Sequence, residues 1–334
     1  MSRFIIKKST VLDQYNKIKE LADTVSYSFK TNNHVGYILR EETDCSFSIH
    51  SIKSLDLLNC PGRIIYFAQG WDKEEASHIY NKGVRDFVVD NEKDLQVLLD
   101  LKQPLNLMLR MRLKEHTVHT GKHFVFGFYS GTVQKLIPSL HSDPNIEKLG
   151  IHVHRKTQNI SEWSLKSEIE DVFSEETLQK IDTINIGGGI PSTYKNFRAE
   201  VLEKIFAKIK SLRDWLQQKG IRMIIEPGRY IAAPSVRLET KILTVYENNI
   251  IVDCSIYNGA MDTFVTNIRL LIEGEGEGEP YTIKGKTPDS IDIFRYKAYL
   301  KNPKPGDTLT FLNAGAYTYS TDFCGLDSIP VEID

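Results

Sequence analysis

The sequence is poor in cysteine. Its 334 residues include four, Cys45, Cys60, Cys254 and Cys324, and no two of them have CxxC spacing. Scattered cysteines of this kind argue against a disulfide framework and against a structural zinc site. They are typical of a protein of the reducing cytoplasm, which is the location we predict.

Long apolar runs and an excess of charge of one sign are also missing. No apolar window reaches the length of a transmembrane helix, and the apolar stretch Phe4–Ile6 is too short for a signal peptide. The formal net charge is -2, so the chain lacks the basic surface expected of a protein that binds nucleic acid or a membrane. We therefore predict neither kind of partner. The hydrophobic content of 41% is enough for a sizeable core.

Short apolar segments alternate with amphipathic segments through the first two thirds of the chain. The strand candidates are Val25–Lys30, Ser46–His50, Arg63–Phe67, Asp86–Val89, Leu105–Met111, Lys148–Val153, Thr183–Ile186 and Arg222–Glu226. The helix candidates include Leu12–Leu21, Lys73–Lys82, Glu92–Leu101, Glu175–Lys180 and Ala199–Lys219. The alternation and the spacing predict a (β/α)8 TIM-like barrel over residues 1–233. Residues 1–10 remain available to pair with the C-terminal domain.

A β-rich C-terminal domain, sandwich-like or barrel-like, is predicted over residues 234–334. Its strand candidates are Val236–Tyr246, Ile250–Ile256, Ile268–Glu273, Tyr281–Lys284 and Thr308–Asn313, and no long helical pattern accompanies them. Within it, residues 273–279 alternate glutamate with glycine. Because such a sequence offers nothing to pack, we predict a solvated loop there.

Two strand ends in the barrel carry distinctive residues, and strand ends are where such barrels place their chemistry. Thr183–Ile186 runs into Gly187, Gly188 and Gly189, whose amides allow the close approach of an anion such as a phosphate. A glycine triplet alone is more often a flexible turn. The strand that ends at Glu226 and continues into Gly228 and Arg229 adds a carboxylate and a guanidinium, and it favours the anion site.

Lys30, at the end of the first barrel strand, has two interpretations. It is either a lysine whose stem lies along the apolar surface or a lysine that forms a Schiff base. A pyridoxal phosphate cofactor needs such a lysine, a phosphate site, a carboxylate (Glu226) for its ring nitrogen and a flat partner (His154) for its ring. His152 and His154 share one face of a strand, but no third ligand with suitable spacing is visible, so we predict no metal site.

The residues around Lys30, Tyr27–Asn32, resemble the Tyr-Ala-Val-Lys-x-Asn motif of the fold-type III pyridoxal phosphate decarboxylases, the ornithine/diaminopimelate/arginine decarboxylase family. Other motifs of that family are matched in order by His154 (ring stacking), Gly187–Gly189 (phosphate loop), Glu226–Arg229 (Glu-Pro-Gly-Arg), Gly285–Asp292 (the motif of the family's catalytic cysteine) and Asn313–Tyr317 (Gly-Ala-Tyr). The resemblance covers nearly the whole chain.

The resemblance implies a pyridoxal phosphate-dependent carboxy-lyase that decarboxylates an amino acid, or an amino-acid conjugate, through a Schiff base at Lys30. The implied cofactor-binding residues are Lys30, His154, Gly187, Gly188, Gly189, Glu226, Gly228, Arg229 and Tyr317. It also implies a head-to-tail homodimer with shared active sites, in which we expect Asp289 and Tyr317 to work in the neighbour's barrel. Two alternatives stay open: an amino-acid racemase or epimerase on the same scaffold, and a non-catalytic pyridoxal phosphate-binding protein.

The chain departs from the family where a proton is donated. Pro288 stands at the position of the catalytic cysteine and has no proton to give. We favour Asp289 as the catalytic replacement, with Cys324 as the alternative donor.

The residues that would bind the substrate also depart from the family. Asn258 stands where ornithine-type enzymes carry an acid, Arg269 lies where diaminopimelate-type enzymes carry a carboxylate-binding arginine, and Ser48 stands where an aspartate is expected. Asn258, Arg269 and Asp289 are the candidates for substrate binding. The sequence leaves the identity of the substrate open.

Overall fold

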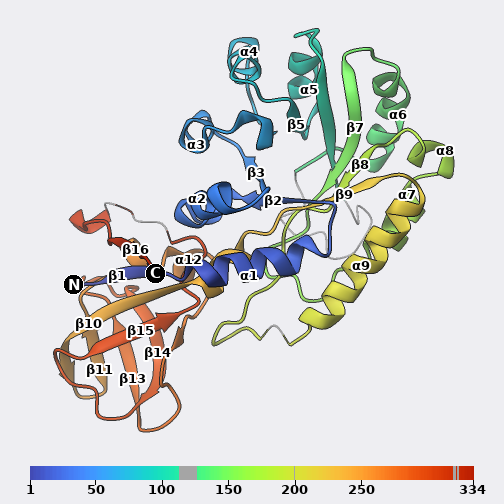
Figure 1. Ribbon diagram of the computed structural model, residues 1–334. Coiled ribbons are helices and arrows are strands. Elements are labelled where there is room, and N and C mark those ends of the chain that lie inside the picture. The colour runs from blue at the N-terminus through green and yellow to red at the C-terminus, as the bar shows by residue number, and fades with distance from the viewer. Residues whose placement is uncertain (113–125, 199, 319–320, 322) are drawn as a thin grey trace.

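The computed structural model describes residues 1–112, 126–198, 200–318, 321 and 323–334 (Figure 1). Eight parallel strands close into a barrel in chain order, and a sheet of mixed strand direction lies beside it. The predicted fold class is therefore confirmed. Among the described residues, no helix is both long and apolar enough to cross a membrane, and all four cysteines are free thiols.

All eight predicted barrel strands are present. They are β2 (Thr24–Ser28), β3 (Ser46–Ile49), β4 (Ile64–Phe67), β5 (Asp86–Val89), β6 (Leu105–Met111), β7 (Ile146–Val153), β8 (Thr183–Asn185) and β9 (Arg222–Ile225). The ring closes where Val25 pairs with Ile225. The first strand ends two residues earlier than predicted, because the chain turns at Phe29–Thr31 into a short 3-10 helix, η1. Lys30 therefore lies on η1 and not on the strand.

Helices surround the barrel (Figure 1). They are α1 (Lys8–Lys19), α2 (Asn33–Glu42), α3 (Ile52–Leu58), α4 (Lys73–Asn81), α5 (Glu92–Leu99), α6 (Ser130–His141), α7 (Leu165–Val172), α8 (Glu175–Leu178) and α9 (Leu202–Gln218), with the 3-10 turn η2 at Pro61–Arg63. Asn32, Ser51 and Asp72 begin three of these helices, since each side chain accepts a hydrogen bond from a backbone amide of the first turn. The inside of the barrel is filled by Ile65, Val88, Met108 and Ile224.

The mixed sheet contains β1 (Arg3–Ile6), β10 (Val236–Tyr246), β11 (Asn249–Val252), β12 (Leu271–Ile272), β13 (Glu279–Lys284), β14 (Ile293–Leu300), β15 (Thr308–Leu312) and β16 (Val331–Ile333). Strand β1 pairs antiparallel with β10 and parallel with β16, so the N-terminal residues do join the C-terminal sheet. The helices of this region are short: α10 (Arg229–Ala232), η3 (Ala233–Ser235), α11 (Ile256–Gly259), α12 (Met261–Val265) and η4 (Phe323–Gly325).

The prediction of a solvated loop at residues 273–279 was wrong for Glu275, whose side chain is 6% exposed. Its two carboxylate oxygens receive hydrogen bonds from the guanidinium of buried Arg295, at 3.0 and 2.6 Å, and one oxygen lies 3.0 Å from Nζ of Lys195. Strand β14, which carries Arg295, was not predicted from the sequence. Without a known partner for Glu275, an alternating Gly/Glu sequence predicts an exposed loop.

The substitution Glu275→Ala is expected to lower the free energy of unfolding by about 3 kcal/mol, because it leaves the Arg295 guanidinium buried without its carboxylate. This value is at the lower end of the range for breaking a buried ion pair, because Arg295 keeps its hydrogen bonds to the backbone carbonyls of Leu270 and Lys297. Urea unfolding at neutral pH measures it.

The matched control is Glu277→Ala, an exposed glutamate of the same loop, which should change the free energy by less than about 0.5 kcal/mol. Equal effects of the two substitutions would contradict a structural role for the buried pair.

Candidate active site

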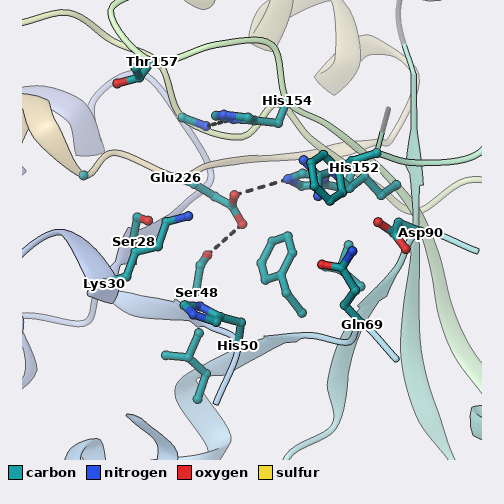
Figure 2. Close-up of a pocket in the computed structure, with 18 of the residues that line it drawn as sticks. Ser28, Lys30, Ser48, His50, Gln69, Asp90, His152, His154, Thr157 and Glu226 are labelled. Atoms are coloured by element: carbon teal, nitrogen blue, oxygen red, sulfur yellow. Dashed lines mark hydrogen bonds and ion pairs between the residues drawn. The ribbon is translucent and has the colours of Figure 1, made fainter. Parts of the chain in front are cut away.

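A cavity of about 730 Å³ opens at the carboxyl ends of the barrel strands (Figure 2). The residues that line it come from most of the strand ends and from the segment after β15. They include Ser28, Lys30, Ser48, His50, Phe67, Gln69, Asp90, Arg110, His152, His154, Thr157, Gly188, Gly189, Glu226, Gly228, Arg229 and Tyr317. The structure thus brings together most of the residues predicted to bind a cofactor.

Glu226 follows β9 directly and lies at the centre of this group. Its Oε1 accepts hydrogen bonds from Ser48 Oγ at 2.7 Å and from Asn185 Nδ2 at 2.9 Å, and its Oε2 lies 3.2 Å from Nε2 of His152. The three partners belong to β3, β8 and β7. The carboxylate is therefore held between the carboxyl ends of these strands, and Figure 2 shows its interactions with Ser48 and His152.

The surroundings of Glu226 keep it charged. Burial alone would raise the pKa of this carboxyl, but His152 and the hydrogen bonds from Ser48 and Asn185 outweigh burial and lower it. A second hydroxyl, Ser26 Oγ, lies 2.7 Å from Ser48 Oγ and supports it. An ionised carboxylate in this position can accept a hydrogen bond from a protonated ring nitrogen.

His154 forms one wall of the cavity, and its Nδ1 accepts a hydrogen bond from the amide of Gly188 at 3.2 Å. Desolvation in the cavity lowers the pKa of His154 to about 4, and the electrostatic influence of His152, Arg110 and Lys30 acts in the same direction. The imidazole is therefore neutral at neutral pH. A neutral flat ring on a cavity wall suits packing against an aromatic ligand.

The glycine triplet allows the loops after β7, β8 and β9 to pack closely. A Cβ on Gly188 would lie 2.6 Å from the carbonyl oxygen of Glu226, and Gly187 and Gly189 have φ angles of +64° and +107°. The amides of Gly187 and Gly188 are bonded within the chain, to Asn185 Oδ1 and to His154. In this structure, anion binding by the triplet therefore falls to Gly189, whose amide has no hydrogen-bond partner among the described residues.

Arg229, the first residue of α10, supplies the cationic part of the same corner. Its Nη1 donates to Tyr194 Oη at 2.9 Å and to Asp262 Oδ2 at 2.5 Å, and its Nε donates to Thr157 Oγ1 at 3.3 Å. Burial would lower the pKa of the guanidinium, but Tyr194 and Asp262 outweigh burial and raise it. Nη2 is buried and has no hydrogen-bond partner in the described chain.

A phosphate group fits this corner of the cavity. The unused donors Arg229 Nη2 and Gly189 N–H and the hydroxyl of Thr157 need an acceptor with several oxygens, and Gly228 leaves no room for a side chain beside Thr31. Lys30 enters the same cavity from η1 and extends toward Glu226 (Figure 2). One cavity therefore contains residues that can bind a phosphate, pack on an aromatic ring, accept a hydrogen bond from a ring nitrogen and form a covalent bond to the ligand.

Tyr317 lines the cavity of its own chain, with the Arg229 guanidinium 5.0 Å from its ring centre. The expectation that Tyr317 works in a neighbour's barrel was therefore wrong. Its backbone amide donates to the carbonyl of Thr31, and Asn32 Nδ2 donates to the carbonyl of Gly315. These bonds fix the end of β15 beside the Lys30 turn, a contact that sequence spacing alone does not reveal.

Asp289 and Cys324 do not line this cavity. Asp289 Oδ2 accepts a hydrogen bond from Tyr257 Oη at 2.9 Å, and the ring of Tyr257 packs against Phe323, next to the exposed Cys324. Asp292 holds the loop of Asp289 in place, since it accepts hydrogen bonds from the amides of Ile256 and Thr287. The two predicted donors lie together, outside the barrel of their own chain.

The predicted substrate residues Asn258 and Arg269 are also outside the cavity. Asn258 has its amide oxygen bonded to the Ser255 amide and its nitrogen bonded to the carbonyl of Asp327. The guanidinium of Arg269 lies over the ring of Tyr296. Their predicted roles stay predictions.

The sequence argument missed part of the site. It did not assign His152, Asn185 or Thr157, and it treated Ser48 only as a departure from the family. The available signal was polarity in apolar strands: Ser26, Ser48, His152 and Asn185 are polar residues of β2, β3, β7 and β8 that are all buried. Buried polar side chains need partners, and here Ser48, His152 and Asn185 share the partner Glu226, while Ser26 bonds to Ser48.

The fold and this cavity define a barrel that binds pyridoxal phosphate. The chain matches, over residues 8–233, the family described as pyridoxal-dependent decarboxylase, pyridoxal binding domain. The chain belongs to that family. Pyridoxal phosphate is therefore the cofactor, as predicted, and the decarboxylase family is confirmed.

Among curated relatives, the diaminopimelate decarboxylase of Methanothermobacter thermautotrophicus is 24% identical over 293 residues, which are 78% of this chain and 66% of that protein. That of Vibrio cholerae is 24% identical over 325 residues, which are 89% of this chain and 77% of that protein. The chain thus spans about two thirds to three quarters of these relatives' length.

The crystal structure of lysine/ornithine decarboxylase complexed with cadaverine from Vibrio vulnificus superposes with a TM-score of 0.85. The sequence identity is 20%, and the alignment covers 100% of this chain and 94% of that one. This similarity is one of fold. None of these relatives supports the racemase or the non-catalytic alternative.

The substitution Ser48→Ala is expected to lower the free energy of unfolding by about 1–3 kcal/mol at pH 7, because it removes a hydrogen bond from a buried carboxylate. The effect depends on pH in a defined direction. Since the folded-state pKa of Glu226 is lowered, its ionised form stabilises the fold above the unfolded-state value of about 4.3, and this contribution is lost as the pH falls through the folded-state pKa.

The effect of Ser48→Ala should therefore shrink below about pH 4, as followed by urea unfolding from pH 7 to pH 3. Ser77→Ala, which removes a hydroxyl from the outer face of α4, is the control and should show no such pH dependence. An effect of Ser48→Ala that is the same at both ends of the range would mean that its hydroxyl does not act on the charged form of Glu226.

Proposed function

We propose that this protein removes the carboxyl group of an amino acid, or of an amino-acid conjugate, with pyridoxal phosphate bound in the barrel cavity. The observation that carries the proposal is the placement of an ionised, buried Glu226 in one cavity with Lys30 and with the unused donors of Arg229 and Gly189. When bound, pyridoxal phosphate supplies an electron sink for the electron pair that the leaving carboxyl group leaves behind.

The residues of the chain bind the cofactor and orient it. Lys30 provides the amine that holds the cofactor and exchanges with the substrate amine. Arg229, Gly189 and Thr157 bind the phosphate, and Glu226 keeps the ring nitrogen protonated. His154 would pack against the face of the ring.

The carbon that has lost its carboxyl group must receive a proton, and the predicted donors lie outside the cavity of their own chain. We propose that Asp289, with Cys324 beside it, reaches the cavity of a partner chain in a head-to-tail homodimer. The surface that carries them supports an interface, because their chain neighbours Phe323 and Ile291 expose 53% and 45% of their surface. The roles predicted for Asn258 and Arg269 are not part of this proposal, since both have local partners.

Lys30→Ala is expected to abolish the visible absorption band of the cofactor-loaded protein and to reduce CO₂ release to background, because the covalent anchor is lost. Circular dichroism should show an unchanged fold, since Lys30 lies on the cavity surface. Lys53→Ala, on the outer face of α3, should keep both the band and the activity. A Lys30→Ala protein that keeps the visible band would refute the cofactor assignment.

Mixing the inactive variants Lys30→Ala and Asp289→Ala tests the shared site. If each site uses Lys30 of one chain and Asp289 of the other, a hybrid dimer has one intact site, and an equimolar mixture should regain about a quarter of the wild-type activity. Subunit exchange is followed by mass spectrometry of the intact dimers. Complete exchange without recovery would place Asp289 outside the partner's site.

A further inference from the structure

His50 is a titratable residue of the cavity that has no role in the proposed function. It follows β3 directly, between Ile49 and the Ser51 side chain that caps α3, and its imidazole lines the cavity below Ser48 (Figure 2). Its imidazole forms no hydrogen bond with any residue that the structure describes. An imidazole without a partner, on the wall of a ligand cavity, is suited to binding the ligand.

The order of the strands around the barrel determines which edge of the cofactor His50 can meet. Glu226 would hold the ring nitrogen, and Lys30, which follows β2, would bind the carbon on the opposite side of the ring. The phosphate would be held at the corner of Gly189 and Arg229, beside β8 and β9. Since β2 lies between β9 and β3 in the closed barrel, the other edge of the ring faces β3.

That other edge of pyridoxal phosphate carries a phenolic oxygen and a methyl group, with the oxygen next to the carbon that Lys30 binds. His50, which follows β3 directly, is a polar residue on this side, and Phe67 at the end of β4 is an apolar one. Polar His50 therefore matches the phenolic oxygen, and apolar Phe67 matches the methyl group.

We propose that His50 donates a hydrogen bond to the phenolic oxygen of bound pyridoxal phosphate and thereby favours the ionised form of that oxygen. The proposal rests on the proposed function, because it requires the cofactor in this cavity. It gives the chain a further residue that touches the cofactor.

The charge of His50 is consistent with a neutral donor. Burial lowers the pKa of His50, and the nearby positive charge of Lys30 acts in the same direction. The imidazole is then neutral at neutral pH, with one N–H to donate. The other titratable groups that line the cavity are Lys30, Asp90, Arg110, His152, His154, Glu226 and Tyr317.

The test uses the cofactor-loaded protein and its absorption spectrum. His50→Leu removes the donor, so at a fixed pH the proton shared between the phenolic oxygen and the Lys30 nitrogen should move to the oxygen, and the absorbance should move from the visible band toward the near-ultraviolet band. The loss of a hydrogen bond to a charged group predicts a fall of about ten- to a hundredfold in the ratio of the visible to the near-ultraviolet form. His50→Gln keeps an N–H donor and should stay within about threefold of the wild-type ratio.

Two controls separate this proposal from the proposed function. His78→Leu, on the exposed side of α4, should leave the spectrum unchanged. A wild-type protein that shows no visible band after loading refutes the cofactor site itself. A ratio of the two bands that is the same in the wild type and in His50→Leu refutes the role of His50 and leaves the cofactor site standing.

A second measurement does not depend on the folding of a variant. In wild-type protein with ¹⁵N-labelled histidine, the His50 signals, assigned by their loss in His50→Gln, should shift when pyridoxal phosphate is added, and inorganic phosphate should not reproduce the shift. Signals that stay in place on loading would overturn the proposal.

Discussion

The site depends on one buried carboxylate. The barrel shields Glu226 from water. The carboxylate stays charged because Ser48, Asn185 and His152 replace the hydrogen bonds that water would have made to it. Each of these partners requires the strand that carries it to be in register with β9. The closed ring of parallel strands and the ionisation of Glu226 are therefore parts of one arrangement, and a change in barrel register would disturb both.

The sequence allowed the barrel to be predicted because period and spacing are local properties. The eight strands, the glycine triplet, and the positions of Glu226 and Arg229 at strand ends all follow from residues that are close in the chain. Ser48 and His152 could not be assigned in this way, since their role is defined by a carboxylate that is 178 and 74 residues distant. Glu275 was misjudged for the same reason, because its partner Arg295 lies on a strand that the local pattern did not reveal.

Contacts with other chain segments explain why Tyr317 lies in the cavity of its own chain and Asp289 does not. Tyr317 reaches the cavity of its own barrel because two hydrogen bonds, one between backbones and one from the Asn32 side chain, join the segment after β15 to the chain beside Lys30. Asp289 is held away from that cavity by its bond to Tyr257 and by the turn that Asp292 organises. Two residues of the C-terminal region therefore lie at different places: Tyr317 lines the cavity of its own chain, and Asp289 lies outside that cavity.

The pairing of β1 with β10 and β16 has a consequence for the order of folding. Phe4 pairs with Leu238 and with Val331, so the first strand to be synthesised finds its partners only after the whole barrel sequence has followed. Closing so long a loop is costly in entropy and slow. The barrel strands, which pair with near neighbours in the chain, can assemble first, and the insertion of β1 between β10 and β16 would then be a late step that locks the finished barrel to the sheet.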